Sequence, residues 1–548
     1  MTEIVPAGIR SQVSPPLPAA EFESEYLDRM KKVAGRNESC RSFIGLGYYG
    51  TITPSVILRN VLENPGWYTP YTPYQAEVAQ GRLEALLNFQ TAVEDLTAME
   101  VANASLLDEA TAAAEALVLL HRIRSRQQDA GNVFLVSDRC FPQTVEVLRG
   151  RAEPLGLDVK MVPEARFAFD KSVFGALLQY PDVNGDIRPL GDVIEAAHEA
   201  GVLVAVATDL LALTLLKPPG ECGADVVFGS AQRFGVPMGY GGPHAAFFAT
   251  RREYVRQIPG RLIGVSVDRH GRQAYRMALQ TREQHIRRER ATSNICTAQA
   301  LLANIAGFYA VYHGADGLRE IACRIQETTH QLAGRLSALG VLQRNVCFFD
   351  TLHLSLGKSS AKRRLRNLAE AQRFNFRYFD EFDVGISLDE TTTSTDVDTI
   401  VSLFAQAMGC EEAESLPAAL NEESDSPVGW PADLVRETDF LNHPVFNSYR
   451  SELQMMRYLK QLERKDIGLD TSMIPLGSCT MKLTAATELI PVTWKEFSDV
   501  HPYVPVEHAA AYHQIFEELE VALCSITGFP AVSLQPNSGA QGEFAGLM

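Results

Sequence analysis

Short apolar runs alternate with helix-like periods between residues 134 and 250. This alternation is typical of strand-helix-strand crossovers and predicts a mainly parallel sheet. The runs are continuous rather than interrupted by polar residues, which suits strands covered by helices on both faces. A helix is predicted at 190–200, and Gly201 after it is a natural helix stop. The predicted strands are 133–136, 176–180, 202–207, 226–228 and 245–249.

The pattern changes after the polar, basic segment 280–290. Two successive long helices are predicted next, and then apolar and polar residues alternate as they do in antiparallel strands. This part of the chain therefore predicts a smaller α+β domain. Its expected helices are 297–313, 317–339, 361–373 and 396–408, and its expected strands fall within 350–356 and 374–388.

An acidic stretch with prolines at 417, 427 and 431 follows this domain and is typical of a linker. A further module is expected to begin near Pro444. The predicted organisation is an amino-terminal arm (1–50), a large domain (51–310), a small α+β domain (311–410), an acidic linker (411–440) and the beginning of a second module (441–548).

One pattern occurs twice in the chain. Residues 42–47 return at 472–477, an offset of 476 − 46 = 430, and the pair Leu96-Thr97 returns as Ile526-Thr527 at the same offset. Residues 70–73 return at 502–505, an offset of 432. Such a period is far longer than a solenoid repeat, so each copy is expected to be a whole folding module, and the second copy has only begun when the sequence ends.

The composition is that of an ordinary soluble globular protein of roughly three to four domains. The 548 residues carry a net charge of −17, and an acidic chain repels phosphate backbones, so no nucleic-acid partner is expected. Nine scattered cysteines without a Cys-x-x-Cys pair indicate a reducing compartment and no metal site. No apolar run reaches the ~18 residues of a membrane helix, so no membrane partner is expected.

Asp209 is the first candidate for chemistry, because it follows the predicted strand 202–207. Ligand-binding groups gather at the carboxyl ends of the strands of an open parallel sheet. A carboxylate there could pair with a protonated pyridine nitrogen and make the ring an electron sink. The structural alternative is a cap on the next segment, 210–216.

The segment 231–244 is rich in glycine and lies shortly after Asp209. Its glycines permit a tight backbone that can approach a ligand, although most such runs are turns. The segment resembles the loop of glycine decarboxylase that reads His-Lys-Thr-Phe-x-x-Pro-x-Gly and holds the Schiff-base lysine. Aligned on Phe234, Pro237 and Gly239, the lysine position holds Gln232, and an amide cannot form the imine.

The resemblance extends over nearly the whole chain, which is similar to the glycine cleavage system P-protein family. This family consists of two homologous halves of the fold type I class of aminotransferases, which depend on pyridoxal 5'-phosphate (PLP). The pattern that occurs twice in this chain then corresponds to the two homologous halves of the family. The chain resembles the amino-terminal half plus the start of the carboxy-terminal half. The segments that carry the resemblance are 43–49, 71–75, 103–109, 281–288, 291–299, 473–481 and 535–539.

In the family only the second half carries the PLP lysine, so the resemblance places that lysine beyond Met548. No catalytic residue is therefore assigned within the chain. Lys217 precedes a Pro-Pro turn and Lys482 lies in an early loop of the second module, and neither suits the role. Both are expected to be solvated lysines.

The segment 535–543 has the pattern of a strand, a turn of small residues and a helix start, which can bind an anion through backbone N–H groups. The resemblance implies that Asn537, Ser538, Gly539 and Ala540 hold the cofactor phosphate; a plain helix cap would have the same pattern. The matching positions of the first half include Asp108 and Glu109, whose carboxylates would repel a phosphate. The first half is therefore expected to bind no cofactor.

Four further residues are candidates with structural alternatives. Thr292 precedes a long predicted helix, and related enzymes imply that it reaches the phosphate of the partner half; the alternative is a helix cap. His285 lies among arginines that could steer an anionic substrate, or could form a solvated face. His244 follows Pro243 and is expected to be structural. Phe141 aligns with the family's ring-stacking histidine, but also suits a core position.

The resemblance implies glycine decarboxylase activity. Glycine would lose CO₂ on PLP, and the aminomethyl group would pass to the lipoyl arm of the H-protein. The halves are expected to pair as a homodimer or pseudo-dimer, in the cytoplasm of a bacterium or the mitochondrial matrix of a eukaryote. This chain looks like a truncated member that is inactive alone. The alternative is a non-catalytic scaffold subunit that pairs with a separate PLP-bearing chain.

Overall fold

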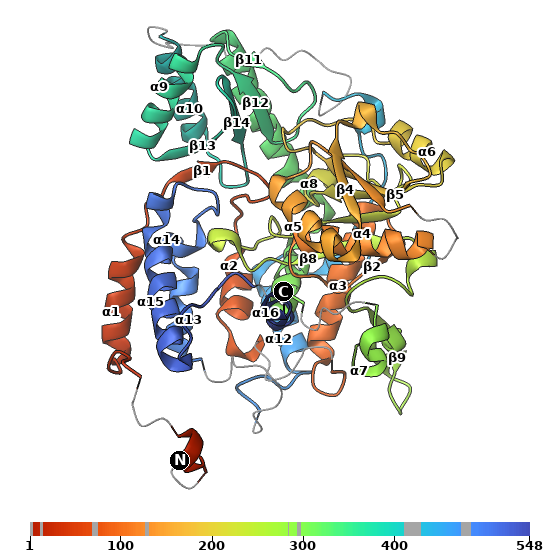
Figure 1. The fold of residues 1–548 in the computed structure, drawn as a ribbon, viewed down its shortest axis with the longest axis vertical. Coiled ribbons are helices and arrows are strands. Elements are labelled where there is room, and N and C mark those ends of the chain that lie inside the picture. Colours follow the sequence, from red (N-terminus) through yellow and green to blue (C-terminus); the bar gives the residue numbers. More distant parts are fainter. Residues whose placement is uncertain are drawn as a thin grey trace. The chain divides into compact units, whose positions relative to one another are not determined.

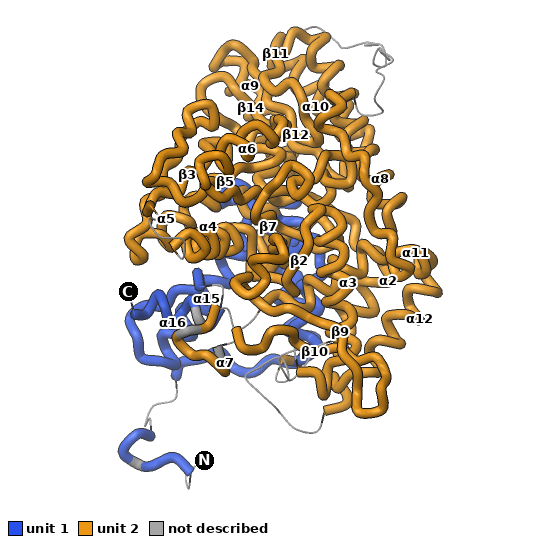
Figure 2. Tube along the Cα trace, turned by 90° about the vertical axis from the view of Figure 1, so that its right-hand side faces the viewer, with its two compact units in different colours: residues 1–39, 485–500, 504–548 blue, residues 40–484, 501–503 orange. Residues whose placement is uncertain are grey.

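The computed structural model describes residues 4–10, 15–67, 75–125, 131–282, 284–292, 298–409, 429–472, 484–536 and 538–547. They form two compact units, which Figure 2 shows in different colours. The larger unit contains residues 40–484 and 501–503. The smaller unit contains residues 1–39, 485–500 and 504–548. These units differ from the five predicted segments, whose boundaries remain a prediction.

A seven-stranded sheet lies at the centre of the larger unit, with strand order β2-β8-β7-β6-β5-β3-β4. Five neighbouring strands of it are parallel, and β8 runs antiparallel to both β7 and β2. The predicted, mainly parallel α/β sheet is therefore confirmed. The strands are β2 (Val101–Ala102), β3 (Val133–Ser137), β4 (Asp158–Val162), β5 (Val173–Tyr180), β6 (Leu203–Thr208), β7 (Val226–Ser230) and β8 (Ala246–Thr250).

All five strands predicted for this region are present, and the structure adds β2 and β4, which were not predicted. Strand β4 is at the edge of the sheet, and its side chains are exposed or half-buried. An edge strand lacks the continuous apolar run that marks a central strand, which explains why its sequence gave a weak signal.

Successive side chains of the sheet contribute to two separate cores. Val133 and Leu135 of β3 belong to one core, and Phe134 and Val136 belong to the other. Because side chains alternate across a strand, these cores are the two faces of the sheet. The first face is covered by α3 (Gln80–Thr97), α6 (Gly191–Glu199) and α8 (Ala300–Ala338), and the second by α4 (Glu109–Ser125) and α5 (Pro142–Ala152).

Helix α8 joins the two helices predicted at 297–313 and 317–339 across a kink, so the prediction of two helical segments is confirmed. It is continuous except for a kink at Gly314, where φ is 62° and ψ is −174°. A Cβ atom at position 314 would lie only 2.7 Å from the carbonyl oxygen of Phe446, so the backbone of Phe446 packs directly against the kink. The sequence placed a boundary at this kink, and the structure shows that the helix resumes directly after it.

A second sheet of five strands has the order β1-β13-β14-β12-β11, and its β12, β13 and β14 pair antiparallel as predicted. Strand β1 lies in the segment predicted as an arm, yet it pairs parallel to β13. Helices α9 (Ser359–Ala371) and α10 (Ser394–Met408) pack on this sheet (Figure 1). The strands are β1 (Arg41–Phe43), β11 (Leu342–Gln343), β12 (Thr351–Ser355), β13 (Phe374–Tyr378) and β14 (Asp383–Ser387).

The larger unit has further elements that the sequence analysis did not predict. An antiparallel hairpin is formed by β9 (Ile263–Val267) and β10 (Gln273–Met277). Residues 501–503 also belong to this unit, and Nε2 of His501 hydrogen-bonds to the carbonyl oxygen of Gly45 at 2.9 Å. The remaining helices are α2 (Ser55–Ile57), α7 (Gln284–Arg287), α11 (Val445–Ser448) and α12 (Glu452–Glu463).

The described part of the predicted linker, residues 429–440, is packed into the larger unit rather than extended. Trp430 and Leu434 are buried in its core, and Trp430 donates a hydrogen bond to the carbonyl oxygen of Phe348. Arg436 donates to four backbone carbonyl groups. The acidic residues between 410 and 428 lie outside the described residues.

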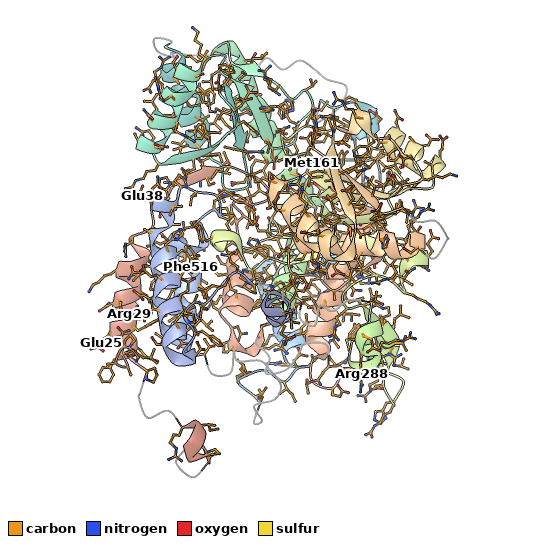
Figure 3. All side chains as sticks on the ribbon, viewed as in Figure 1. Glu25, Arg29, Glu38, Met161, Arg288 and Phe516 are labelled. Atoms are coloured by element: carbon orange, nitrogen blue, oxygen red, sulfur yellow. The ribbon has the colours of Figure 1, made fainter. Side chains whose placement is uncertain are left out.

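The smaller unit is helical. Its core joins Met30, Val33 and Ala34 of α1 to Phe497 and Ala511. Figure 3 labels Arg29, whose Nε lies 2.8 Å from a carboxylate oxygen of Glu21. The helices are α1 (Glu23–Ala34), α13 (Ala486–Leu489), α14 (Lys495–Ser498), α15 (Ala510–Thr527) and α16 (Gly539–Leu547). Of the helices in the described residues, none combines the length and apolar character that crossing a bilayer requires.

The internal repeat is visible in the helices. Helices α3 and α15 each have 18 residues and begin 510 − 80 = 430 positions apart, and α4 and α16 begin 539 − 109 = 430 positions apart. Both 18-residue helices end in the left-handed conformation, at Ala98 (φ 54°) and at Gly528 (φ 76°). The two copies therefore repeat their local fold as well as their sequence.

Candidate functional site

A cavity lies at the carboxyl ends of the parallel strands β3, β5, β6 and β7, where an open α/β sheet places its ligands. Several polar side chains of the large sheet and its loops meet there, and residues just before and within β12 of the second sheet close it. Those that carry the argument are Tyr49, Glu109, Asp209, Gln232, Arg233 and Asp350.

Gln232 is buried at the position where the resemblance expects the lysine. Its Nε2 donates to the carbonyl oxygens of Tyr49 and Val236 at 2.8 and 2.7 Å. Its Oε1 accepts from the backbone N–H of Tyr49 at 3.0 Å. Every polar atom of the amide is thus used in holding the loop, and a lysine ammonium could not accept the bond from Tyr49.

Asp209 has two roles that the sequence presented as alternatives. Its Oδ1 accepts from the backbone N–H of Leu211 at 2.8 Å, which caps the following turn. Its Oδ2 lies 3.1 Å from Nε of Arg233. Burial raises the pKa of Asp209, and the charge of Arg233 opposes that shift. The carboxylate therefore has a cationic partner within the chain.

Arg233 is the central residue of the cavity and was missed by the sequence analysis. Its side chain is only 4% exposed. It pairs with Asp209 and with Asp350, and its Cζ lies 3.5 Å from the ring centre of Tyr49. Burial alone would lower the pKa of Arg233, but the two carboxylates raise it above its usual value. The one available signal was its place next to Gln232 in the glycine-rich loop.

Two carboxyl groups mark the start of α4. Asp108 accepts from the backbone N–H of Thr111 at 2.7 Å and so caps the helix. Glu109 is the first residue of α4 and lines the cavity. Burial, with a further contribution from the charge of Asp209, raises the pKa of Glu109 to about 8. A backbone N–H group at this helix start, which could otherwise bind a phosphate, therefore already donates to the carboxylate of Asp108.

The cavity that remains is small. Its free volume is about 30 Å³, whereas pockets for small-molecule ligands measure about 300–1,000 Å³. Phe141, the predicted counterpart of a ring-stacking histidine, lines it. Oε1 of Gln179 and Oγ1 of Thr208 have no hydrogen-bond partner among the described residues. About two waters would fill the space and satisfy them, so the residues present do not fit PLP.

The second copy differs at the corresponding helix start. Ser538 takes the position of Asp108, and its Oγ accepts from the backbone N–H of Gln541 at 3.3 Å. Gly539 takes the position of Glu109 and begins α16. Neither residue carries a charge. Asn537 and the side chain of Ala540 lie outside the described residues.

Thr292 is half-buried and is held through its backbone. Its N–H donates to the carbonyl oxygen of Arg282 at 3.1 Å, and its carbonyl oxygen accepts from Arg122 at 3.0 Å. The alternative reading as the cap of the next helix is wrong, because α8 begins at Ala300 with Gln299 as its N-cap. The role of Thr292 toward a phosphate stays a prediction.

The other candidate residues are placed as follows. His244 is buried, its Nε2 is 3.1 Å from the carbonyl oxygen of Pro237, and burial lowers its pKa to about 4. It is therefore part of the packing, as expected. Lys217 lines a separate groove and not the cavity at the strand ends. Lys482 and the side chain of His285 lie outside the described residues.

Comparison with known proteins assigns this arrangement to a family. The family model described as glycine cleavage system P-protein matches residues 1–404. The chain is 55% identical over 547 residues to glycine dehydrogenase (decarboxylating) of Thermosynechococcus vestitus, covering 100% of this chain and 56% of that protein. It is 55% identical over 546 residues to glycine dehydrogenase (decarboxylating) 2 of Pseudomonas putida, with the same coverage. The chain spans about half the length of these curated relatives.

A solved structure gives the same result for the fold. The inhibitor-bound crystal structure of glycine decarboxylase (P-protein) of the glycine cleavage system matches with a TM-score of 0.67 and 34% sequence identity. The match covers 74% of this chain and 94% of that one. The large sheet, its helices and the small domain thus have the predicted PLP-dependent fold type I architecture.

Proposed function

Because this chain belongs to the glycine cleavage system P-protein family, we propose that it supplies the first half of a glycine decarboxylase and the beginning of the second. The complete enzyme would decarboxylate glycine and pass the aminomethyl group to the lipoyl arm of the H-protein. In this proposal the first half forms a wall of the active site, and the reaction takes place in the second half.

The observation that carries the proposal is the difference between the two equivalent helix starts. In the first copy Asp108 caps α4 and Glu109 follows it, whereas Ser538 and Gly539 take these positions in the second. The carboxylate of Asp108 repels a phosphate dianion at the first helix start. The uncharged Ser538 and Gly539 are compatible with one, because backbone donors and the positive end of a helix favour an anion. The replacement of the lysine by Gln232 agrees with this division.

The second half would hold PLP, which supplies an electron sink for the electrons released when glycine loses CO₂. Ser538, Gly539 and the neighbouring Asn537 and Ala540 would bind its phosphate. Thr292 would contribute a hydroxyl from the first half. Arg122 and Arg282 hold the backbone on both sides of Thr292 and would keep it in position.

The test is exchange of labelled bicarbonate into glycine, measured with lipoylated H-protein and PLP. We expect no exchange above background with the 548-residue chain alone, because its site lacks the lysine. Exchange is expected when a polypeptide corresponding to the rest of the curated relatives is added. In that mixture Ser538→Asp, which keeps a helix cap but adds a charge, should reduce exchange at least tenfold. The control Asp108→Ser should stay within twofold.

Two results would contradict the proposal. One is exchange by the 548-residue chain alone, with a borohydride-stable adduct at Lys217 or Lys482. The other is equal loss of exchange in the Ser538→Asp and Asp108→Ser variants. If the chain is instead a scaffold subunit, it should restore exchange to a separately made complete second half, and removal of residues 485–548 should then have no effect.

A further inference from the structure

The guanidinium of Arg233 is a flat, buried cation. The groups around it are those that a binding site would offer to a flat cationic ligand. Asp209, directly after β6, lies 3.1 Å from its Nε. Asp350, directly before β12, accepts from its Nη2. The ring of Tyr49 lies 3.5 Å from its Cζ, and the ring of Phe349 lies 5.5 Å away. A carboxylate at the edge and an aromatic face beside it form a recognition set for a planar cation.

The same set would suit the protonated ring of the cofactor. Asp209 follows β6, where a carboxylate could pair with a protonated pyridine nitrogen, and the inference rests on this assignment together with the proposed function. We propose that Arg233 is an internal replacement for the cofactor ring. Its side chain fills the first-half cleft, pairs its charge with that of Asp209 and excludes any pyridoxal compound, whether or not a lysine is present at position 232.

The replacement also connects two parts of the larger unit. Asp209 directly follows a strand of the seven-stranded sheet, and Asp350 directly precedes a strand of the five-stranded sheet. Arg233 therefore bridges the two sheets through buried charges, and removing it would leave two buried carboxylates without their cation. A site that exchanges ligands needs room between its sheets. The bridge instead keeps the first half closed.

The surrounding contacts favour this reading over a vacant ligand site. The free volume of about 30 Å³ leaves space for water only. The Gln232 amide is held by Tyr49 on both sides, and Tyr49 in turn stacks on Arg233. Arg233, Gln232 and Tyr49 thus form one closed arrangement in which each residue fixes the next.

The experiment uses pyridoxal, which lacks the phosphate that the carboxylate of Asp108 would repel. Three forms of the full chain are incubated with pyridoxal, reduced with borohydride and digested. The adduct at position 232 is then quantified by peptide mass spectrometry. The forms are the wild type, Gln232→Lys, and Gln232→Lys with Arg233→Thr and Asp350→Asn. The last substitution removes one of the two carboxylates that would lose their cation and leaves Asp209 to pair with the ring.

We expect no adduct at position 232 in the wild type and at most a trace in Gln232→Lys. The triple variant should give at least ten times more adduct than Gln232→Lys. Equal labelling of the single and triple variants would overturn the proposal, because the ring would then not depend on the removal of Arg233. An unlabelled triple variant that unfolds as cooperatively as the wild type would also overturn it.

A second measurement covers a triple variant that fails to fold. In Arg233→Ala the cleft should accept free guanidinium in place of the lost side chain. Millimolar guanidinium chloride should raise the thermal midpoint of Arg233→Ala and leave the wild type unchanged, with equal sodium chloride as the control. An equal response of both proteins would contradict the proposal. Neither readout needs glycine turnover, so failure of this inference and failure of the proposed function are distinguishable.

Discussion

Asp466 and Arg82 form a buried ion pair between residues 384 positions apart, with 2.8 Å between Nη1 and Oδ2. The same carboxylate accepts from the backbone N–H groups of Gly81 and Arg82, and so caps the first turn of α3. The side chain of Arg82 also donates to the carbonyl oxygens of Gly66 and Trp67. The beginning of α3 is therefore anchored by a residue that follows α12.

Asp466→Ala should lower the free energy of unfolding of the larger unit by about 3–5 kcal/mol, because it removes the carboxylate that pairs with the buried Arg82 guanidinium. Urea unfolding followed by circular dichroism measures the loss. Asp470→Ala, at an exposed carboxylate nearby, is the control and should change stability by about 0.5 kcal/mol or less. An equal effect of both substitutions would show that the ion pair contributes nothing specific.

The repeat supplies a matched pair of substitutions. Ala98 and Gly528 end equivalent helices in the left-handed conformation, which disfavours alanine by about 1–2 kcal/mol. Ala98→Gly should therefore raise the thermal midpoint of the larger unit, and Gly528→Ala should destabilise α15. Calorimetry on each full-length variant tests both signs. A lower midpoint for Ala98→Gly would contradict the shared geometry.

Glu109 makes the stability dependent on pH. Its pKa is raised to about 8, mainly by burial, so the folded chain keeps a proton that the unfolded chain releases above about pH 4.3. The stabilising contribution is complete below that pH and is lost as the pH rises toward 8. Glu109→Gln should be more stable than the wild type at pH 9, and the difference should shrink toward pH 4. Parallel thermal midpoints from pH 4 to 9 would count against the raised pKa.

Arg436 holds the end of the linker against the larger unit. Its guanidinium donates to the carbonyl oxygens of Asp95, Leu96, Leu213 and Thr438 at 2.7–2.9 Å. Arg436→Ala leaves these acceptors unpaired, and we expect limited proteolysis by chymotrypsin to cut near Trp430 at least tenfold faster. Glu437→Ala, at an exposed neighbour, should leave the rate unchanged. Equal rates in the two variants would show that the linker is held by other contacts.

Local sequence patterns were sufficient for the central strands. Runs such as 202–207 are apolar on every residue because helices cover both faces of the sheet, and this requirement is written into each segment separately. The duplication and the amide at position 232 were also visible without a structure. The edge strand β4 was missed, because its residues are exposed or half-buried and do not form a continuous apolar run.

Which distant side chains meet was decided only by the tertiary structure. A basic residue at position 233 and an acidic one at 350 are unremarkable in the sequence, and only folding brings their charges together in a cavity. The same holds for β1 beside β13 and for Arg436 among four carbonyl groups. Burial and charge pairing depend on the whole arrangement of the chain, whereas helix and strand periods depend on neighbours. The repeated pattern and the absent lysine therefore belong to the sequence, and the arginine that closes the first-half cleft belongs to the fold.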